Sequence, residues 1–248
     1  MGTLILNSVR KIAARVMLLP AQAFALGLMM FALSPPLVAD ESVTAEVNQP
    51  YVAHYEVTRR GRSHGEAIRR LELLENSQYR YYTETEVSFL FLSDRRVQIT
   101  EFEFVQGQIH PLVYEYERTG TGSDDQLTYD FAEHSNEQNI LDANSVLHQL
   151  QLGLANGQSE FEFDVLNEHG ERETYRFEVM GDETVSVPYG TLDTLKVARV
   201  RNSQRRETYF WFSPLLNYSL VQMQQIKEGK EQAKLSLKSI QLSALQES

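Results

Sequence analysis

The largest part of the chain shows the hydropathy pattern of short β-strands. From Tyr51 onward, runs of β-forming residues are broken by turn residues at intervals of about eight to twelve residues. Within one such run, Tyr114, Tyr116 and Arg118 alternate with Glu115, Glu117 and Thr119. A period of two is typical of a half-buried strand. The pattern predicts an all-β fold, mainly a curved antiparallel sheet in the form of a half-barrel or open barrel.

One segment in the middle of this region does not alternate. Over residues 142–155, leucine and valine recur at helical spacing. Asp142 or Asn144 can cap the start of a helix, and Gly157 can end it. We therefore expect one short helix in mid-domain, with a β-rich half on each side, inside a single domain over residues 51–243.

The N-terminal residues have the layout of an export signal. Basic residues come first, then an almost wholly apolar run over 16–33, then small and helix-breaking residues up to Ala39; the basic residues are Arg10, Lys11 and Arg15. An uncleaved membrane anchor is the alternative, because a spanning helix needs about 20 apolar residues. No basic cluster follows Ala39, however. We expect a cleaved signal peptide over 1–39, a disordered segment over 40–50, and no integral membrane segment after cleavage.

Charge and cysteine content narrow the range of functions. The net charge is −11, and loss of residues 1–39, which hold three basic residues and no acidic one, makes it −14. Such an acidic domain repels nucleic acid and anionic head groups, because binding to phosphates depends on Lys and Arg. The chain has no cysteine, which excludes disulfides, thiolate metal sites and an acylated cysteine. An export signal without cysteine fits the periplasm of a Gram-negative bacterium.

Several short motifs, taken in order, resemble an exported bacterial family of unknown function, domain 3108 (DUF3108). The clearest is Val187–Val197, with the sequence VPYGTLDTLKV. Others are Tyr55–Val57 with the glycines that follow, Ser93–Arg95 as a link after the third strand, Asp142–Leu147 at the helix start, and Tyr209–Ser213 in a late strand. The resemblance covers about residues 50–242 and implies an envelope location and a curved β-sheet. The family has no assigned catalytic residues, so none is transferred to this chain.

The clearest motif has the chemistry of a turn. Proline fixes φ and glycine permits a positive φ, a combination suited to tight turns. Asp and Thr side chains can hydrogen-bond to nearby backbone groups. We therefore interpret the motif as structural; its residues are Pro188, Gly190, Thr191, Asp193 and Thr194.

Reactive chemistry has little support in the sequence. Gly61–Gly65 (GRSHG) matches the Gly-x-Ser-x-Gly motif of hydrolases, but that motif works on a strand-to-helix turn, whereas both flanks here have strand patterns. The histidines show neither His-x-x-x-His nor His-Glu-x-x-His spacing; they are His54, His64, His110, His134, His148 and His169. We predict no catalytic residues, no metal site and no cofactor.

One apolar run is unusual. Val87–Leu92 is apolar apart from Ser88, and alternation would place Phe89 and Phe91 on one face and Leu90 and Leu92 on the other. Both faces then need cover. Either the predicted helix covers this strand, or Phe89–Leu92 form the apolar lip of a ligand groove, since exposed apolar patches mark interaction sites.

These features predict a periplasmic, non-enzymatic binding protein. The concave face of its sheet would hold a lipid, an acyl chain or an envelope protein partner, and we expect no nucleic acid partner. A structural envelope scaffold that acts through protein contacts is the alternative, and an envelope hydrolase is the least favoured. The sequence does not specify the ligand or the oligomeric state.

Overall fold

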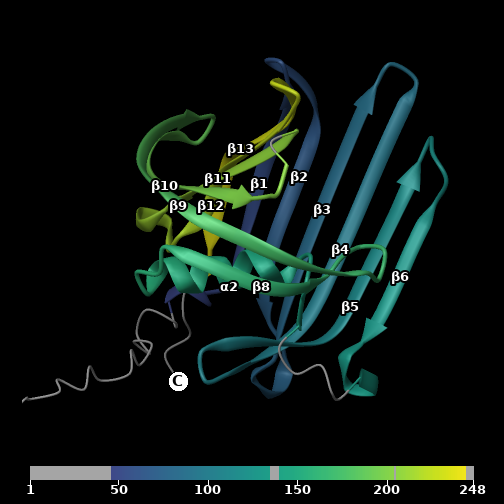
Figure 1. Cartoon of the computed structure of the whole chain (residues 1–248), viewed down its shortest axis with the longest axis vertical. Helices are drawn as coiled ribbons and strands as arrows, with labels where there is room; N and C mark the ends of the chain where they lie inside the picture. Colours follow the sequence, from purple (N-terminus) through teal and green to yellow (C-terminus); the bar gives the residue numbers. More distant parts are fainter. Residues whose placement is uncertain (1–45, 135–139, 204, 244–248) are drawn as a thin grey trace, which may run out of the picture. The chain divides into compact units, whose positions relative to one another are not determined.

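The computed structural model describes residues 46–134, 140–203 and 205–243. These residues belong to one compact unit. Within the described ranges, its main elements are a single sheet of thirteen strands and the helix α2 (Figure 1). The signal peptide expected over 1–39 lies outside the described residues. In the part of the chain that the structure describes, no helix is long and apolar enough to cross a membrane.

The strands follow one another in the sheet almost without a crossover. The first half lies in the order β6-β5-β4-β3-β2-β1, and β13 pairs with β1 to continue the sheet through β12-β11-β10-β9-β8-β7. All neighbours are antiparallel except β7 and β8. The strands are β1 (Tyr51–Arg59), β2 (Arg62–Leu73), β3 (Tyr79–Phe89), β4 (Leu92–Val105), β5 (Gln108–Gly120), β6 (Asp125–Asp130), β7 (Ile140–Asp142), β8 (Glu160–Leu166), β9 (Arg172–Val187), β10 (Gly190–Val200), β11 (Arg206–Ser213), β12 (Ser219–Lys227) and β13 (Lys230–Leu242).

Alternation along each strand creates the concave face. In β1, the residues Tyr51, Ala53, Tyr55 and Val57 are buried, while the side chains between them are more exposed. The same period recurs in the neighbouring strands, so one apolar core collects side chains from both halves of the chain. A smaller core joins β5 and the segment after β6 to β7 and β8; its buried residues are Tyr114, Tyr116, Phe131 and Leu166.

The helix α2 (Ser145–Ala155) lies against this concave face and presents buried leucines to the core. A buried carboxylate holds its first turn: Asp142 Oδ1 accepts hydrogen bonds from the backbone N–H groups of Asn144 and Ser145, each at 2.9 Å. The hydroxyl of Thr100 on β4 donates to the same oxygen at 2.7 Å. The helix start is thereby fixed to the sheet. At the other end Gly157, at φ 76°, ends the helix.

The predicted fold class is confirmed: a mainly antiparallel curved sheet with one short helix in mid-domain. Two expectations are wrong in detail. Within the segment 40–50, expected to be disordered, Val47 and Asn48 are buried against the domain. The link after the third strand is Leu90–Phe91, not Ser93–Arg95, which already belongs to β4.

Candidate functional site

The concave face holds a partly open cavity of about 440 Å³ between the two halves of the sheet. Its floor is made by the start of the helix, where Ala143, Val146 and Leu147 point into it. Apolar side chains from both halves line the walls next to this floor; they are Val57, Ala67, Phe177, Phe210, Met223 and Leu235. The inner part of the cavity therefore offers apolar surface of the kind that binds a hydrocarbon chain.

A cationic side chain interrupts this apolar lining. Arg69 lies on β2 between the buried residues Ala67 and Leu71, and so points to the concave face. Its Nη1 donates to the hydroxyl of Tyr81 at 3.1 Å, but its Nε is buried without a hydrogen-bond partner. Among the described residues, no carboxylate forms an ion pair with it. Because a buried guanidinium is expensive to leave unpaired, an anionic group in this cavity would be stabilised by Arg69.

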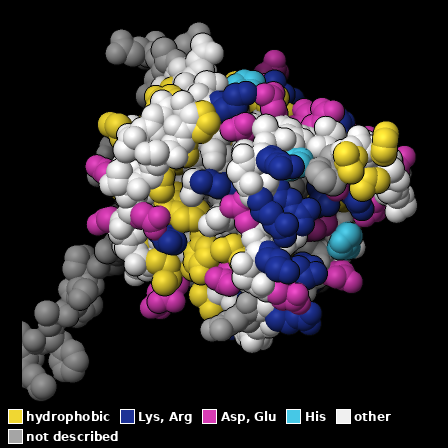
Figure 2. All heavy atoms as spheres, turned by 90° about the horizontal axis from the view of Figure 1, so that it is seen from above, with side chains coloured by type: hydrophobic (Ala, Val, Ile, Leu, Met, Phe, Trp, Pro, Cys, Tyr) yellow, Lys and Arg dark blue, Asp and Glu magenta, His cyan; other side chains and the backbone are white. Residues whose placement is uncertain are grey.

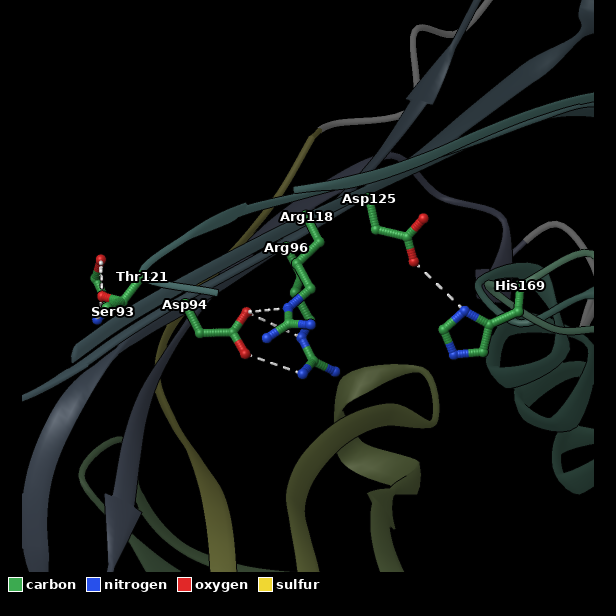
Figure 3. A network of polar contacts seen from close by, with 7 residues as sticks. All are labelled: Ser93, Asp94, Arg96, Arg118, Thr121, Asp125 and His169. Carbon is green, nitrogen blue, oxygen red and sulfur yellow. Dashed lines mark hydrogen bonds and ion pairs between the residues drawn. The ribbon is translucent and has the colours of Figure 1, made fainter. Parts of the chain in front are cut away.

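At the outer part of the cavity the lining becomes charged. Asp94 of β4 joins two arginines: its Oδ2 lies 2.9 Å from Nη2 of Arg96, and its Oδ1 lies 3.3 Å from Nε of Arg118 (Figure 3). Hydrogen bonds from Arg96, and the charges of both arginines, lower the pKa of the Asp94 carboxyl group. This network carries one more positive charge than negative.

The opposite wall adds one more arginine. Arg199 of β10 stacks on the ring of Tyr175, with its Cζ 3.4 Å from the ring centre, and lies 3.5 Å from a carboxylate oxygen of Glu173. Arg201, just after the end of β10, lies outside the lining of this cavity; burial together with the charge of Arg199 lowers its pKa to about 10. The cavity lining thus balances three arginines, Arg69, Arg96 and Arg199, against three carboxylates, Glu84, Asp94 and Glu168.

A second cavity, of about 450 Å³, continues from the first toward the β3–β4 hairpin. The two share Val57, Val87, Asp94 and Ala233 in their linings. Leu92, from the apolar run that the sequence singled out, lines this second cavity. The concave face thus offers a continuous groove from the helix to the hairpin.

The structure separates the four residues proposed as a ligand lip. Leu90 and Phe91 form the turn of the β3–β4 hairpin and are 82% and 95% exposed, and Leu92 is 60% exposed. The interpretation as a strand covered by the helix is therefore wrong, because the chain reverses at Leu90 and the side chains of Leu90 and Phe91 are exposed. The side chain of Phe89 lies outside the described part of the structure.

The other motifs fall into hairpins. Pro188 and Tyr189 form the two-residue link between β9 and β10, with Gly190 opposite Val187. Thr194 donates to the backbone oxygen of Glu183, and Asp193 accepts from Thr184 at 2.7 Å. In the described structure Thr191 contacts the hydroxyl of Ser186 across the same hairpin.

The Gly61–Gly65 motif also lies in a hairpin, since Arg60 and Gly61 connect β1 to β2. Ser63 is exposed near the start of β2, and no strand-to-helix turn surrounds it. Over the described ranges, no three His, Cys, Asp or Glu side chains are grouped so that they could hold a metal ion.

Sequence reasoning missed Arg69, the arginines of the outer cavity, and His148. On the sequence alone, His148 is considered only as a metal ligand, whereas its side chain is 0% exposed and lies between the helix and the sheet. Alternation contained part of the signal for Arg69, because this residue shares the face of Ala67 and Leu71.

Comparison with known proteins confirms the resemblance drawn from the motifs. The model of a family described as "Protein of unknown function (DUF3108)" matches residues 92–237. No curated protein matches the chain.

Among solved structures, a β-barrel-like protein of the domain of unknown function DUF1849 from Brucella abortus is similar in fold. It shows 9% identity and a TM-score of 0.50, and the match covers 79% of this chain and 98% of that one. The MucA/MucB complex of Pseudomonas aeruginosa gives 10% identity and a TM-score of 0.37, over 82% of this chain and 56% of that one.

Proposed function

This chain belongs to the DUF3108 family, and we propose that it is a binding protein that holds an amphipathic ligand, an acyl chain with an anionic head group, in the concave face of its sheet. The observation that carries the proposal is the pairing of an apolar cavity with Arg69, a cation that has no carboxylate partner among the described residues. The volume of about 440 Å³ lies within the range of small-molecule pockets.

The division of the cavity matches the two parts of such a ligand. The hydrocarbon chain would contact the apolar walls, where each buried methylene contributes about 0.8 kcal/mol. The anionic head group would accept hydrogen bonds from Arg69, whose Nε is available. A charge-assisted hydrogen bond is about twice as strong as a neutral one.

The same proposal includes an envelope location and the absence of catalysis. The export signal expected over 1–39 would deliver the chain to the periplasm of a Gram-negative cell. The exposed position of Ser63 at a hairpin supports binding rather than hydrolysis, because a hydrolase serine needs a base and an oriented backbone around it.

The test is a titration with oleate and with oleyl alcohol, which share a chain and differ in the charge of the head group. Binding would be followed by displacement of the fluorescent fatty acid cis-parinaric acid. In the variant Arg69→Gln, we expect affinity for oleate to fall by about tenfold to a hundredfold, because hydrogen bonds to charged groups contribute about 1.5–3 kcal/mol. Affinity for oleyl alcohol should be unchanged.

The matched control is Arg70→Gln. Arg70 is the next residue of the same strand, but it lies on the outer face, where its guanidinium stacks over Tyr82 at 4.8 Å. We expect this variant to bind oleate as the wild type does. Equal effects of the two substitutions, or a wild type that binds neither probe, would contradict the proposal.

A structural envelope scaffold is the second candidate, and the two ends of the sheet favour it. β6 and β7 are the terminal strands, and a terminal strand offers backbone groups that can pair with another chain. Under this alternative, substitutions in β6 would abolish capture of an envelope protein, whereas Arg69→Gln would have no effect on it.

A further inference from the structure

We propose that the tip of the β3–β4 hairpin inserts into the surface of an anionic lipid bilayer, and that the basic turns beside it contact the lipid head groups. Leu90 and Phe91 line neither cavity of the concave face, so the inference goes beyond the proposed ligand and is tested separately.

The tip presents large apolar side chains to solvent. Leu90 is 82% exposed, Phe91 is 95% exposed and Leu92 is 60% exposed, and the three are consecutive. Scattered exposed apolar residues are normal on a protein surface, but a contiguous group marks a site of interaction. In Figure 1, this hairpin extends to the top of the molecule.

Turn chemistry does not explain these residues. Phe89 pairs with Leu92, which leaves a two-residue turn, and Leu90 adopts φ 57°. Such turns favour Gly, Asn or Asp at positive φ, because a bulky side chain is unfavourable there. A leucine and a phenylalanine at this position are therefore better explained by a contact that the tip makes than by the stability of the turn.

The turn is also held in place from one side. The backbone N–H of Ser93 donates to the hydroxyl of Thr121 at 2.8 Å, and the backbone N–H of Thr121 donates to the backbone oxygen of Ser93 at 2.9 Å. The backbone of Gly120 lies close to Ser93, since a Cβ there would be 2.2 Å from the Ser93 oxygen. Figure 3 shows this contact directly beside the Asp94 network. The apolar side chains are thus presented on a supported hairpin.

Basic turns lie at the same end of the sheet. Since consecutive strands are antiparallel, the β1–β2, β3–β4 and β5–β6 turns share one end. The β12–β13 turn lies beside them, because the backbone N–H of Arg60 donates a hydrogen bond to the side chain of Glu231 at 2.6 Å. The β10–β11 turn lies beside the β12–β13 turn, because the backbone N–H of Glu228 donates to the backbone oxygen of Arg205 at 2.8 Å.

Two of these turns carry arginine without an acidic residue: 59–62 contains Arg59, Arg60 and Arg62, and 201–206 contains Arg201, Arg205 and Arg206. Figure 2 looks onto this end and shows basic side chains gathered there, with apolar side chains standing out at one edge.

The distribution of charge favours a membrane over a protein partner. The whole chain is acidic, at −11, so arginines concentrated at one end orient that end toward an anionic surface. They lie in two turns at the same end of the sheet as the narrow apolar tip, an arrangement that fits a plane of anionic head groups above hydrocarbon. Each basic residue near such a surface strengthens binding by about fivefold.

The first experiment measures sedimentation with vesicles of phosphatidylcholine alone and of phosphatidylcholine with phosphatidylglycerol. We expect wild-type protein to bind the anionic vesicles more strongly, and added salt to weaken that binding. The double substitution Leu90→Ser and Phe91→Ser should lower binding by tenfold or more. The matched control is Leu215→Ser: Leu215 is 79% exposed and lies in the 3-10 helix Pro214–Leu216 between β11 and β12, at the opposite end of the sheet. It should bind as the wild type does.

The second experiment reports the depth of insertion. Phe91→Trp places an indole at the tip, Leu215→Trp places one at the far end, and the native Trp211 is buried and common to both. Lipids with brominated acyl chains should quench tryptophan emission in the Phe91→Trp variant and leave the Leu215→Trp variant unchanged.

Equal quenching in both variants, or vesicle binding that the serine substitutions do not change, would overturn the proposal. The proposal would also be overturned if the wild-type protein bound an envelope protein but no vesicles, and if the Leu90→Ser and Phe91→Ser substitutions abolished that protein binding. The tip would then be a protein contact.

Discussion

The buried imidazole of His148 makes the stability of the domain depend on pH. The ring lies between helix α2 and the sheet, with Nδ1 2.8 Å from Oε1 of Gln151 and Nε2 3.0 Å from Oδ1 of Asn48. Its other neighbours are the rings of Tyr81, Phe102 and Phe104. Burial therefore lowers the pKa of His148 from 6.5 to about 4.

The sign and size of the effect follow from this pKa. Above pH 6.5 the ring is neutral in both the folded and the unfolded chain, so it contributes no pH dependence. Between pH 6.5 and pH 4, the unfolded chain binds a proton that the folded chain excludes. The free energy of unfolding therefore decreases as the pH is lowered through this range. At about 1.4 kcal/mol per pH unit, the decrease in the free energy of unfolding reaches about 3 kcal/mol at pH 4. Helix α2 forms the floor of the cavity, so acid should also weaken ligand binding.

Urea unfolding of the wild type and of His148→Gln at several pH values between 7.5 and about 4 tests this reasoning. The variant should be less stable at pH 7.5, because it loses buried contacts, but its stability should fall less on acidification. Other titrating groups, including the buried Asp142, are common to both proteins and cancel in the difference. Parallel curves for the two proteins would refute the assignment, because they would mean that His148 titrates alike in the folded and unfolded chains.

Two further predictions concern the frame around the cavity. Asp142→Ala removes the acceptor for Thr100 and for the first backbone N–H groups of the helix. Urea unfolding should therefore show a decrease of about 3 kcal/mol in the free energy of unfolding, and a smaller decrease for Asp142→Asn. Equal stability of all three proteins would contradict this role. Gly65→Ala would place a Cβ 1.9 Å from the backbone oxygen of Glu86, so the paired strands β2 and β3 must move apart. Thermal unfolding should then show a decrease of about 2 kcal/mol in the free energy of unfolding. An unchanged melting temperature would contradict this, because it would mean that the strands move apart at no cost in stability.

Much of the fold could be predicted because it depends on local alternation. The period of two in segments such as Tyr51–Val57 identifies both the strand and its buried face, and the helical spacing of the leucines identified α2. The pattern could not place the reversal at Leu90, because continuous apolar residues resemble a buried strand and lack turn residues. Only the structure shows that the chain turns there with its side chains in solvent.

The candidate site was less accessible to sequence reasoning, because it depends on which residues face each other across the sheet. Arg69 on β2 and Arg199 on β10 are far apart in sequence. They line the same cavity only because the pairing of β13 with β1 joins the two halves of the sheet. Net charge likewise contains no information on position. The net charge of −11 predicts repulsion of anionic head groups, but it does not show that two arginine-rich turns, 59–62 and 201–206, lie at the same end of the sheet. Position, not total charge, decides what such a surface attracts.

The central claim is that the concave face carries an amphipathic anion, and native mass spectrometry of the protein extracted from its own host tests it most directly. We expect an added mass on the wild type that fragmentation identifies as an acyl chain with an acidic head group, and its loss from Arg69→Gln but not from Arg70→Gln. Wild-type protein that comes out of the envelope with no bound molecule, and takes up none from a lipid extract, would contradict the account.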